Sequence, residues 1–200
     1  MRSNLIFIIV LICGALNGFG QQRSNRPVFH SQEQVSMING DGAVSAGIQS
    51  VNGFKINQWF AGVGVGLDFY RYRSVPVFVD VKRYFKIRNG NALFIYGDGG
   101  YNIPWVKKQE EQWSIWGWPS KTDIKYKGGA YMDAGAGYAI QFKKGNALLL
   151  SVGYSHKYFS EKKMVTSWTG GVVENAEGTT DVQKYTYSFN RIMIKAGWQF

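Results

Sequence analysis

The chain has 200 residues, a length that suits one domain or at most two. Its single cysteine excludes an internal disulfide and any site built from several thiolates. A formal net charge of +10 suits nucleic acid, anionic lipid or lipopolysaccharide as a partner. Glycine and aromatic residues are abundant, long helical patterns are missing, and short alternating runs predict an all-β protein.

Residues 1–20, "MRSNLIFIIVLICGALNGFG", have the layout of a secretory signal peptide. A basic residue precedes an apolar run, which is too short to span a membrane, and small residues precede a predicted cleavage after Gly20. Cys13 would be the acylated residue of a lipoprotein, but bulky Ile12 stands where a small residue is expected. The sequence therefore predicts an exported domain over 21–200 without cysteine, and export argues against nucleic acid as a partner.

Turn signals divide the exported part into eight predicted strands. The signals are "NGDG" at 39–42, "NG" at 52–53, "RNGN" at 88–91 and "KKGN" at 143–146. The predicted strands cover 32–38, 43–52, 56–70, 76–86, 91–104, 127–142, 146–159 and 186–200.

Two longer polar stretches, 105–127 and 160–185, are expected to be loops. If the last strand ends on the periplasmic side, both stretches fall on the outer side and the short turns after even-numbered strands fall on the periplasmic side. Short periplasmic turns and long outer loops are the layout of transmembrane barrels. No segment after the signal peptide approaches 18 consecutive apolar residues, so no transmembrane helix is expected.

Nearly every predicted strand has one apolar face and one face of glycine and charge. In the third strand, Val63 and Val65 alternate with Gly64, Gly66 and Asp68. A soluble lipid carrier would place the apolar face inside, whereas a membrane barrel would place it outside. Glycine is depleted on solvated strands, but a narrow barrel interior needs small residues, so the glycine face is predicted to line the interior.

The charges on that face would be enclosed and would have to pair with one another. The predicted interior network comprises Asp68, Asp80, Lys82, Asp98, Asp133, Arg191 and Lys195. It could merely fill the barrel and hold its shape, or it could serve a ligand or a proton relay. Eight strands leave room only for side chains, which argues against a diffusion channel.

Several segments together resemble a known family. They are "SVNGFKINQWFAGVGVGLDFY", "VPVFVDVKRYF", "ALFIYGDGGYNI", "GGAYMDAGAGYAI", "LLLSVGYSHKY" and the terminal "KAGWQF". Over roughly residues 40–200 the chain resembles the small outer-membrane β-barrel proteins of Gram-negative bacteria, the OmpA/OmpX-like barrels. The resemblance implies an eight-stranded antiparallel up-and-down transmembrane β-barrel in the outer membrane, in contact with its lipids and lipopolysaccharide. It also implies that Trp198 and Phe200 form the signal that the barrel-assembly machinery recognises.

The first long polar stretch concentrates tryptophan and lysine. A predicted outer contact surface comprises Trp105, Lys107, Lys108, Trp113, Trp116, Trp118 and Lys121. These residues could cover the barrel mouth or rest at the lipopolysaccharide boundary. Exposed aromatics with mixed charges are also typical of recognition, so they could instead bind another envelope protein.

Catalysis has few candidate residues. His156 follows Ser155, but neighbours on a strand point to opposite faces and cannot readily pair as base and nucleophile. His30 is expected to be solvated, and two histidines without cysteine do not suggest a metal site. No catalytic, cofactor or metal residue is predicted, and a structural or docking role is expected. The alternative is an outer-membrane enzyme that modifies lipid A by acyl transfer or deacylation.

Overall fold

A computed structural model describes residues 26–87, 90–106, 110–115, 118–142, 145–168 and 178–200, so the predicted signal peptide lies outside the described part. None of the described residues forms a helix long and apolar enough to cross a membrane. The strands are β1 (Val28–Gly40), β2 (Ala43–Ile56), β3 (Trp59–Asp68), β4 (Ser74–Lys86), β5 (Ala92–Pro104), β6 (Glu110–Ile115), β7 (Trp118–Gln141), β8 (Ala147–Trp168) and β9 (Gly178–Gln199).

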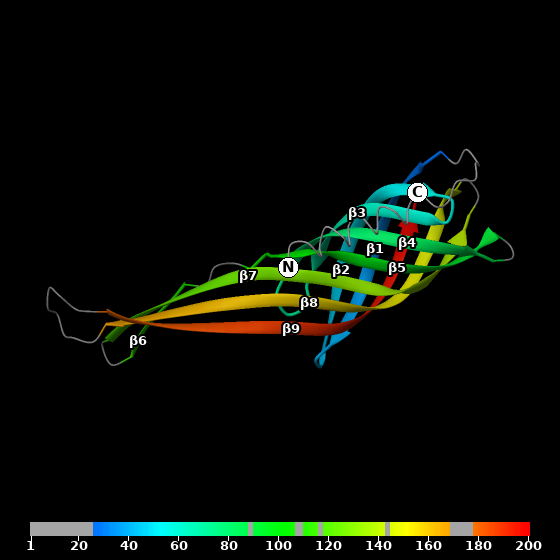
Figure 1. Cartoon of the computed structure of the whole chain (residues 1–200). Helices are drawn as coiled ribbons and strands as arrows, with labels where there is room; N and C mark the ends of the chain where they lie inside the picture. Colours follow the sequence, from blue (N-terminus) through cyan, green and yellow to red (C-terminus); the bar gives the residue numbers. More distant parts are fainter. Residues whose placement is uncertain (1–25, 88–89, 107–109, 116–117, 143–144, 169–177) are drawn as a thin grey trace, which may run out of the picture.

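Eight of these strands close into a ring. Each strand from β1 to β5 pairs antiparallel with the next, β5 pairs with β7, and β7, β8 and β9 follow in order. β9 then pairs with β1, from Gln32 opposite Gln199 to Asn39 opposite Ile192. The predicted eight-stranded antiparallel up-and-down barrel is confirmed (Figure 1). The ninth strand, β6, pairs only with β7.

One predicted turn is wrong. The "NG" at 52–53 lies inside β2, and the chain turns instead at Asn57, whose φ of 58° is left-handed. Gly53 faces inward, and a Cβ there would lie against backbone atoms of Ala61 and Gly62 on β3. This glycine therefore permits close approach of two strands, while Gly90 and Gly145, with φ of 82° and 86°, occupy the predicted turns.

The two stretches predicted as long loops are largely strand. β7, β8 and β9 have 24, 22 and 22 residues, and β8 stays paired with β9 as far as Trp168 opposite Gly178. The strands β1 to β5 have only 10–14 residues, so these three longer strands project beyond the wall. Threonine, valine, isoleucine and tyrosine, which favour strands, recur there, and each strand finds backbone partners on its neighbour. We call β6 with residues 118–128, 159–168 and 178–189 the outer extension (Figure 1).

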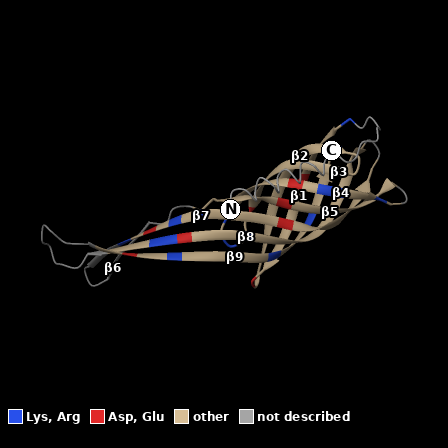
Figure 2. Ribbon diagram, in the orientation of Figure 1, with Lys and Arg blue, Asp and Glu red and all other residues tan. Residues whose placement is uncertain are grey.

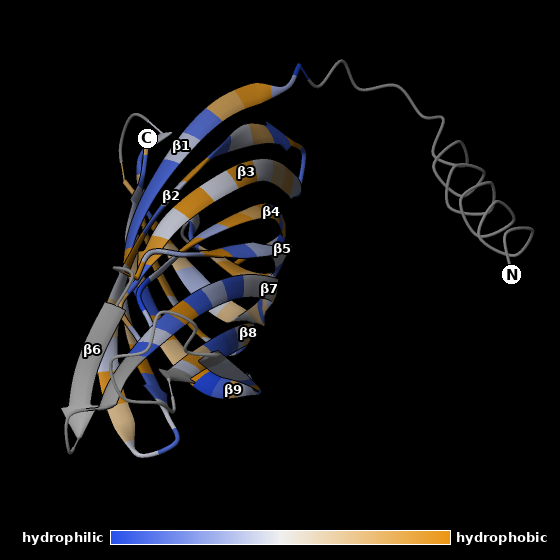
Figure 3. Ribbon diagram, turned by 90° about the vertical axis from the view of Figure 1, so that its left-hand side faces the viewer, coloured by the Kyte–Doolittle hydropathy of each residue, from blue (hydrophilic) through white to orange (hydrophobic). Residues whose placement is uncertain are grey.

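Burial alternates residue by residue within the wall, and Figure 3 shows alternating hydropathy along the strands. Inside, aromatic rings fill the space that the glycines leave. Phe78 is opposite Gly64, and a Cβ on Gly64 would collide with the Phe78 ring. Outside, the wall exposes large apolar side chains, among them Val35, Met37, Ile48, Val63, Val65, Val77, Val79, Leu93, Ile95, Met132, Leu150, Val152, Ile192 and Ile194.

Candidate functional sites in the interior and at the outer mouth

Asp68 forms ion pairs with the two buried cations nearest the outer mouth. Arg191 Nη1 donates to Asp68 Oδ2 at 2.5 Å, and Lys157 Nζ lies 3.2 Å from the same oxygen. Arg191 Nη2 also donates to Ser155 Oγ at 2.8 Å. Lys157 donates further to the Tyr72 carbonyl and to Ser74 Oγ, both at 2.9 Å. Two cations from β8 and β9 thus converge on one carboxylate from β3.

Lys195 forms the middle of the network. Its Nζ lies 2.5 Å from Asp133 Oδ2 and 3.2 Å from Asp98 Oδ2, and it sits 4.5 Å from the centre of the Tyr96 ring. Tyr96 in turn donates its hydroxyl to Asp133 Oδ1 at 3.1 Å. Asp98 and Asp133 are directly opposite each other on β5 and β7, and Lys195 reaches them from β9, which is separated from β7 by β8 alone.

Lys82 is the centre of the charged contacts at the end of the barrel nearest the short turns. It donates to Asp80 Oδ2 at 2.7 Å and to Gln32 Oε1 at 2.5 Å. Gln32 donates to Gln199 Oε1 at 3.3 Å, as does the hydroxyl of Tyr84. The chain of hydrogen bonds therefore links β4 to the seam between β1 and β9.

All seven residues of the predicted interior network face the interior and are buried, with Asp68, Asp80, Asp98 and Asp133 only 5%, 1%, 6% and 1% exposed. Lys157, fully buried, was not predicted as a member. Its place on the polar face of β8, in step with Ser155, was the signal that could have assigned it. Four carboxylates thus meet four cations, and their formal charges sum to zero. Figure 2 shows positive and negative positions close together on the strands of the barrel. Beside Asp68 the described interior holds a cavity of only about 10 Å³.

Tyr72, in the turn between β3 and β4, leans over the barrel mouth onto the inner face of the outer extension. Its ring stacks on Phe159 at 4.7 Å, and its hydroxyl donates to Glu161 Oε2 at 3.2 Å. Tyr187 donates to the same oxygen at 3.4 Å. Burial, followed by the hydrogen bond to Tyr187 and the charge of Glu161, raises the pKa of the Tyr72 hydroxyl. This cluster closes the mouth with aromatic rings.

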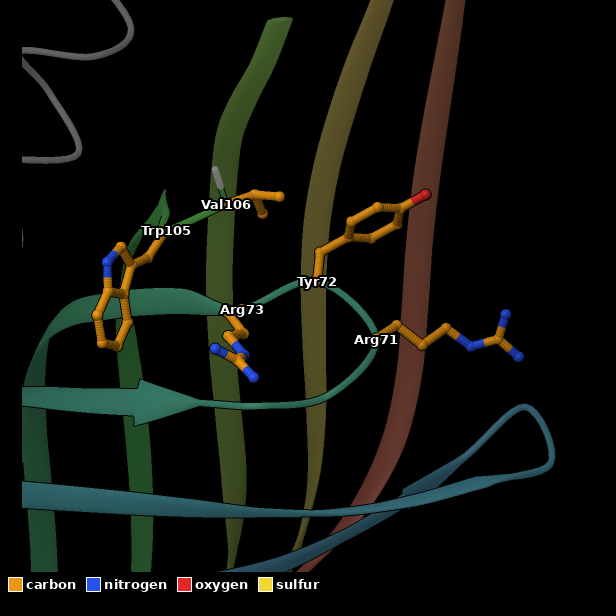
Figure 4. A pocket seen from close by; sticks show the side chains of 5 residues that line it. All are labelled: Arg71, Tyr72, Arg73, Trp105 and Val106. Carbon is orange, nitrogen blue, oxygen red and sulfur yellow. The ribbon is translucent and has the colours of Figure 1, made fainter. Parts of the chain in front are cut away.

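A groove of about 440 Å³ lies at the outer rim, lined by Arg71, Tyr72, Arg73, Trp105 and Val106 (Figure 4). Trp105 is 56% exposed, and its backbone nitrogen donates to the Arg73 carbonyl at 2.8 Å. In Figure 4 the side chains of Trp105 and Arg73 extend to one side of the turn and Arg71 to the other.

Only part of the predicted outer contact surface can be placed. Trp105 and Lys121 are exposed. Lys107, Lys108 and Trp116 lie outside the described residues. Trp113 and Trp118 belong to the backbone of the hairpin between β6 and β7, opposite Ser120 and Ile115.

Ser155 and His156 point to opposite faces of β8. Ser155 is buried against Arg191, whereas Nδ1 of His156 lies 2.9 Å from Asn190 Oδ1 on the outer face. His30, expected to be solvated in an extension, instead belongs to β1, and its Nδ1 lies 2.9 Å from the Phe200 carbonyl. The described residues contain no cluster of three or more metal-binding side chains.

The C-terminal residues lie at the end of the barrel opposite the outer extension. Trp198 is half-buried, and its ring stacks on Phe142 at 5.2 Å. Phe200 is exposed, and its backbone nitrogen donates to the Ser31 carbonyl at 2.9 Å. Both are therefore ordered parts of the rim.

The chain matches no protein-family model and no curated protein. Among solved structures, an alignment covers 89% of this chain and 100% of OmpTΔL8, a loop L8 deletion mutant of OmpT, an outer membrane protein of Vibrio cholerae. The two are 8% identical, with a TM-score of 0.14. A likeness at that level indicates neither the fold nor the function of this chain.

Proposed function

We propose that the protein is a non-enzymatic outer-membrane β-barrel that spans the bilayer and docks a partner through its outer extension. The observation that carries the proposal is the inverted distribution of polarity: the charges are inside a closed ring and the large apolar side chains are outside. A soluble protein rarely exposes a continuous apolar surface of this kind. In a bilayer the same surface would contact hydrocarbon, and ring closure would satisfy every backbone group of the wall.

Exposed aromatic side chains near both ends of the barrel support the proposal that it spans a membrane. Trp59 and Phe85 are exposed near the short turns, and Tyr101, Trp105 and Tyr158 are exposed near the outer mouth. Transmembrane barrels carry such aromatic girdles at both interfaces, with an apolar band between them. Trp198 and Phe200 then fall at the periplasmic rim, where the barrel-assembly machinery would engage the last strand.

The outer extension supports a docking role. Residues 178–190 of β9 pair with β8, whereas pairing of β9 with β1 begins only at Ile192. Within the described residues the other edge of this part of β9 is therefore unpaired. An open strand edge is a template on which another chain can add a strand, so another envelope protein is a suitable partner.

Membrane fractionation of expressing cells tests the proposal. The protein should pellet with outer membranes, resist extraction by high salt or carbonate, dissolve in detergent, and migrate differently on a gel before and after boiling. A soluble periplasmic carrier would remain in the supernatant, and that result would reject the proposal. Crosslinking and pull-down from native membranes, with wild type and with a variant lacking 110–127 and 160–187, would then test docking; equal capture by both would reject the docking role.

A further inference from the structure

Three lysines lie side by side across the outer extension. Lys125 on β7 is directly opposite Lys162 on β8, and Lys162 is directly opposite Lys184 on β9. Residues paired in this way share one face of the sheet with their Cβ atoms about 5 Å apart, and like charges there destabilise it. All three are exposed, and the ion pair found beside them in the described part is Lys125 with Asp123, at 3.6 Å. The row therefore concentrates positive charge on one face of the outer extension.

The two faces of the outer extension differ in charge. On β7, β8 and β9 the face that bears the lysine row contains five lysines and one carboxylate: Lys121, Lys125, Lys127, Lys162 and Lys184, with Asp123. On β6, Glu110 is directly opposite Asp123 and adds a second acidic position at the edge of this face. The opposite face, which turns toward the barrel mouth, contains Glu161, Lys163 and Asp181 with Tyr126, Tyr185 and Tyr187. Because side chains alternate strictly along a strand, this segregation makes one face basic.

The basic face directly continues the apolar wall. On β8 the exposed Tyr154 and Tyr158 lie on the same face as Lys162, and Lys162 is four residues farther out than Tyr158. At the rise of a strand this is about 13 Å along the chain beyond the aromatic side chains that mark the membrane interface. A ligand of this face would therefore lie beside the outer extension, just outside the aromatic side chains at the outer mouth.

We propose that this basic face binds the phosphate groups of a phosphorylated glycolipid of the outer leaflet, such as lipopolysaccharide. The inference rests on the proposed function and names the lipid partner of the outer extension. Five lysines against two carboxylates, Asp123 and Glu110, provide the charge complementarity. Continuity with the apolar wall places the acyl chains of the same lipid against Val152 and Ile192. Juxtamembrane lysines attract anionic headgroups in this way, and salt weakens the attraction.

Neighbouring lysines on β8 provide the decisive variants. The full chain, refolded in nonionic detergent, is titrated with fluorescently labelled lipopolysaccharide, and binding is measured by anisotropy. Lys162→Gln is expected to weaken binding about fivefold, whereas Lys163→Gln removes the same charge from the opposite face and should change it less than about twofold. Replacing Lys125, Lys162 and Lys184 together should weaken binding by roughly 100-fold and flatten its dependence on salt. Heat-modifiable migration on a gel verifies that each variant is folded.

Equal effects of Lys162→Gln and Lys163→Gln would overturn the inference, and so would equal binding of the glycolipid after enzymatic removal of its phosphates. If soluble polyphosphate binds the wild type as tightly as the glycolipid does, the face serves a soluble polyanion and the lipid assignment is wrong. Flotation of the wild type with vesicles distinguishes a failure of the proposed membrane function from a failure of glycolipid binding. Failure to float rejects the proposed function, whereas flotation with lysine-independent binding rejects only this inference.

Discussion

Replacing Asp68 by asparagine tests whether the charges inside the barrel stabilise it as a paired set. Asp68 Oδ2 holds Arg191 at 2.5 Å and Lys157 at 3.2 Å, and all three side chains are buried. The asparagine would leave two cations facing a neutral amide and the interior with a net charge of +1. Removing one partner of a buried ion pair costs about 3–5 kcal/mol. With a urea dependence of about 1–3 kcal/mol per molar, the unfolding midpoint should fall by at least about 1 M.

Equilibrium unfolding in urea, with the barrel in lipid vesicles, measures this shift by tryptophan fluorescence and by gel migration. Asp123→Asn is the matched control, because its ion pair with Lys125 is exposed and should contribute only about 0–1 kcal/mol. Adding Arg191→Met to Asp68→Asn should restore part of the loss, since Lys157 keeps its carbonyl and hydroxyl acceptors. If Asp68→Asn costs no more than Asp123→Asn, the interior charges do not stabilise the barrel through pairing and the reasoning fails.

Three further outcomes are expected. Gly53→Ala should destabilise by about 1–3 kcal/mol because its Cβ would meet the backbone of β3, whereas Gly97→Ala, with open space around it, should be nearly neutral; similar losses in urea unfolding would contradict this. The raised pKa of Tyr72 means that its contribution is complete below about pH 10 and is lost as pH rises toward the folded pKa, since the unfolded phenol ionises first. Tyr72→Phe should therefore lose less stability than wild type between pH 8 and pH 11, and parallel losses would show that Tyr72 does not titrate as described. His156→Ala should leave the mass spectrum of lipid A from expressing cells unchanged, and a missing or shifted acyl species would instead favour an enzyme.

Most of the fold can be predicted from the period-two alternation of apolar and polar residues in the sequence. It distinguishes the two faces of each strand, and turn chemistry at Gly90 and Gly145 separates the strands. Which aspartate meets which cation depends on strand register and on contacts across the ring. Arg191 reaches Asp68 from 123 positions away, and alternation contains no information on such a pair. For Lys157 the alternation does indicate the polar face of β8, but its contact with Asp68 likewise depends on the arrangement across the ring.

The boundaries that sequence reasoning missed have two physical causes. The Asn-Gly pair that contains Gly53 is typical of a turn. In the structure, however, glycine is required at this position because β3 packs closely against it, so the residue reflects a tertiary contact and not a turn. The stretches 105–127 and 160–185 look like loops because they are polar on both faces. Their described parts are mostly strand nevertheless, because β7, β8 and β9 provide one another with backbone partners well beyond the wall.

The seam between β1 and β9 determines when the barrel can exist. Its side-chain contact between Gln32 and Gln199 joins residues 167 positions apart, so the ring closes only after the last strand has been delivered. Pairing over such a separation has a large loop-closure cost and forms slowly. Until β9 pairs with β1, the curved sheet has two open margins, β1 and β9, that could pair with a second copy. Shielding these two margins before the seam forms is therefore expected to raise the yield of folded protein more than strengthening the finished wall does.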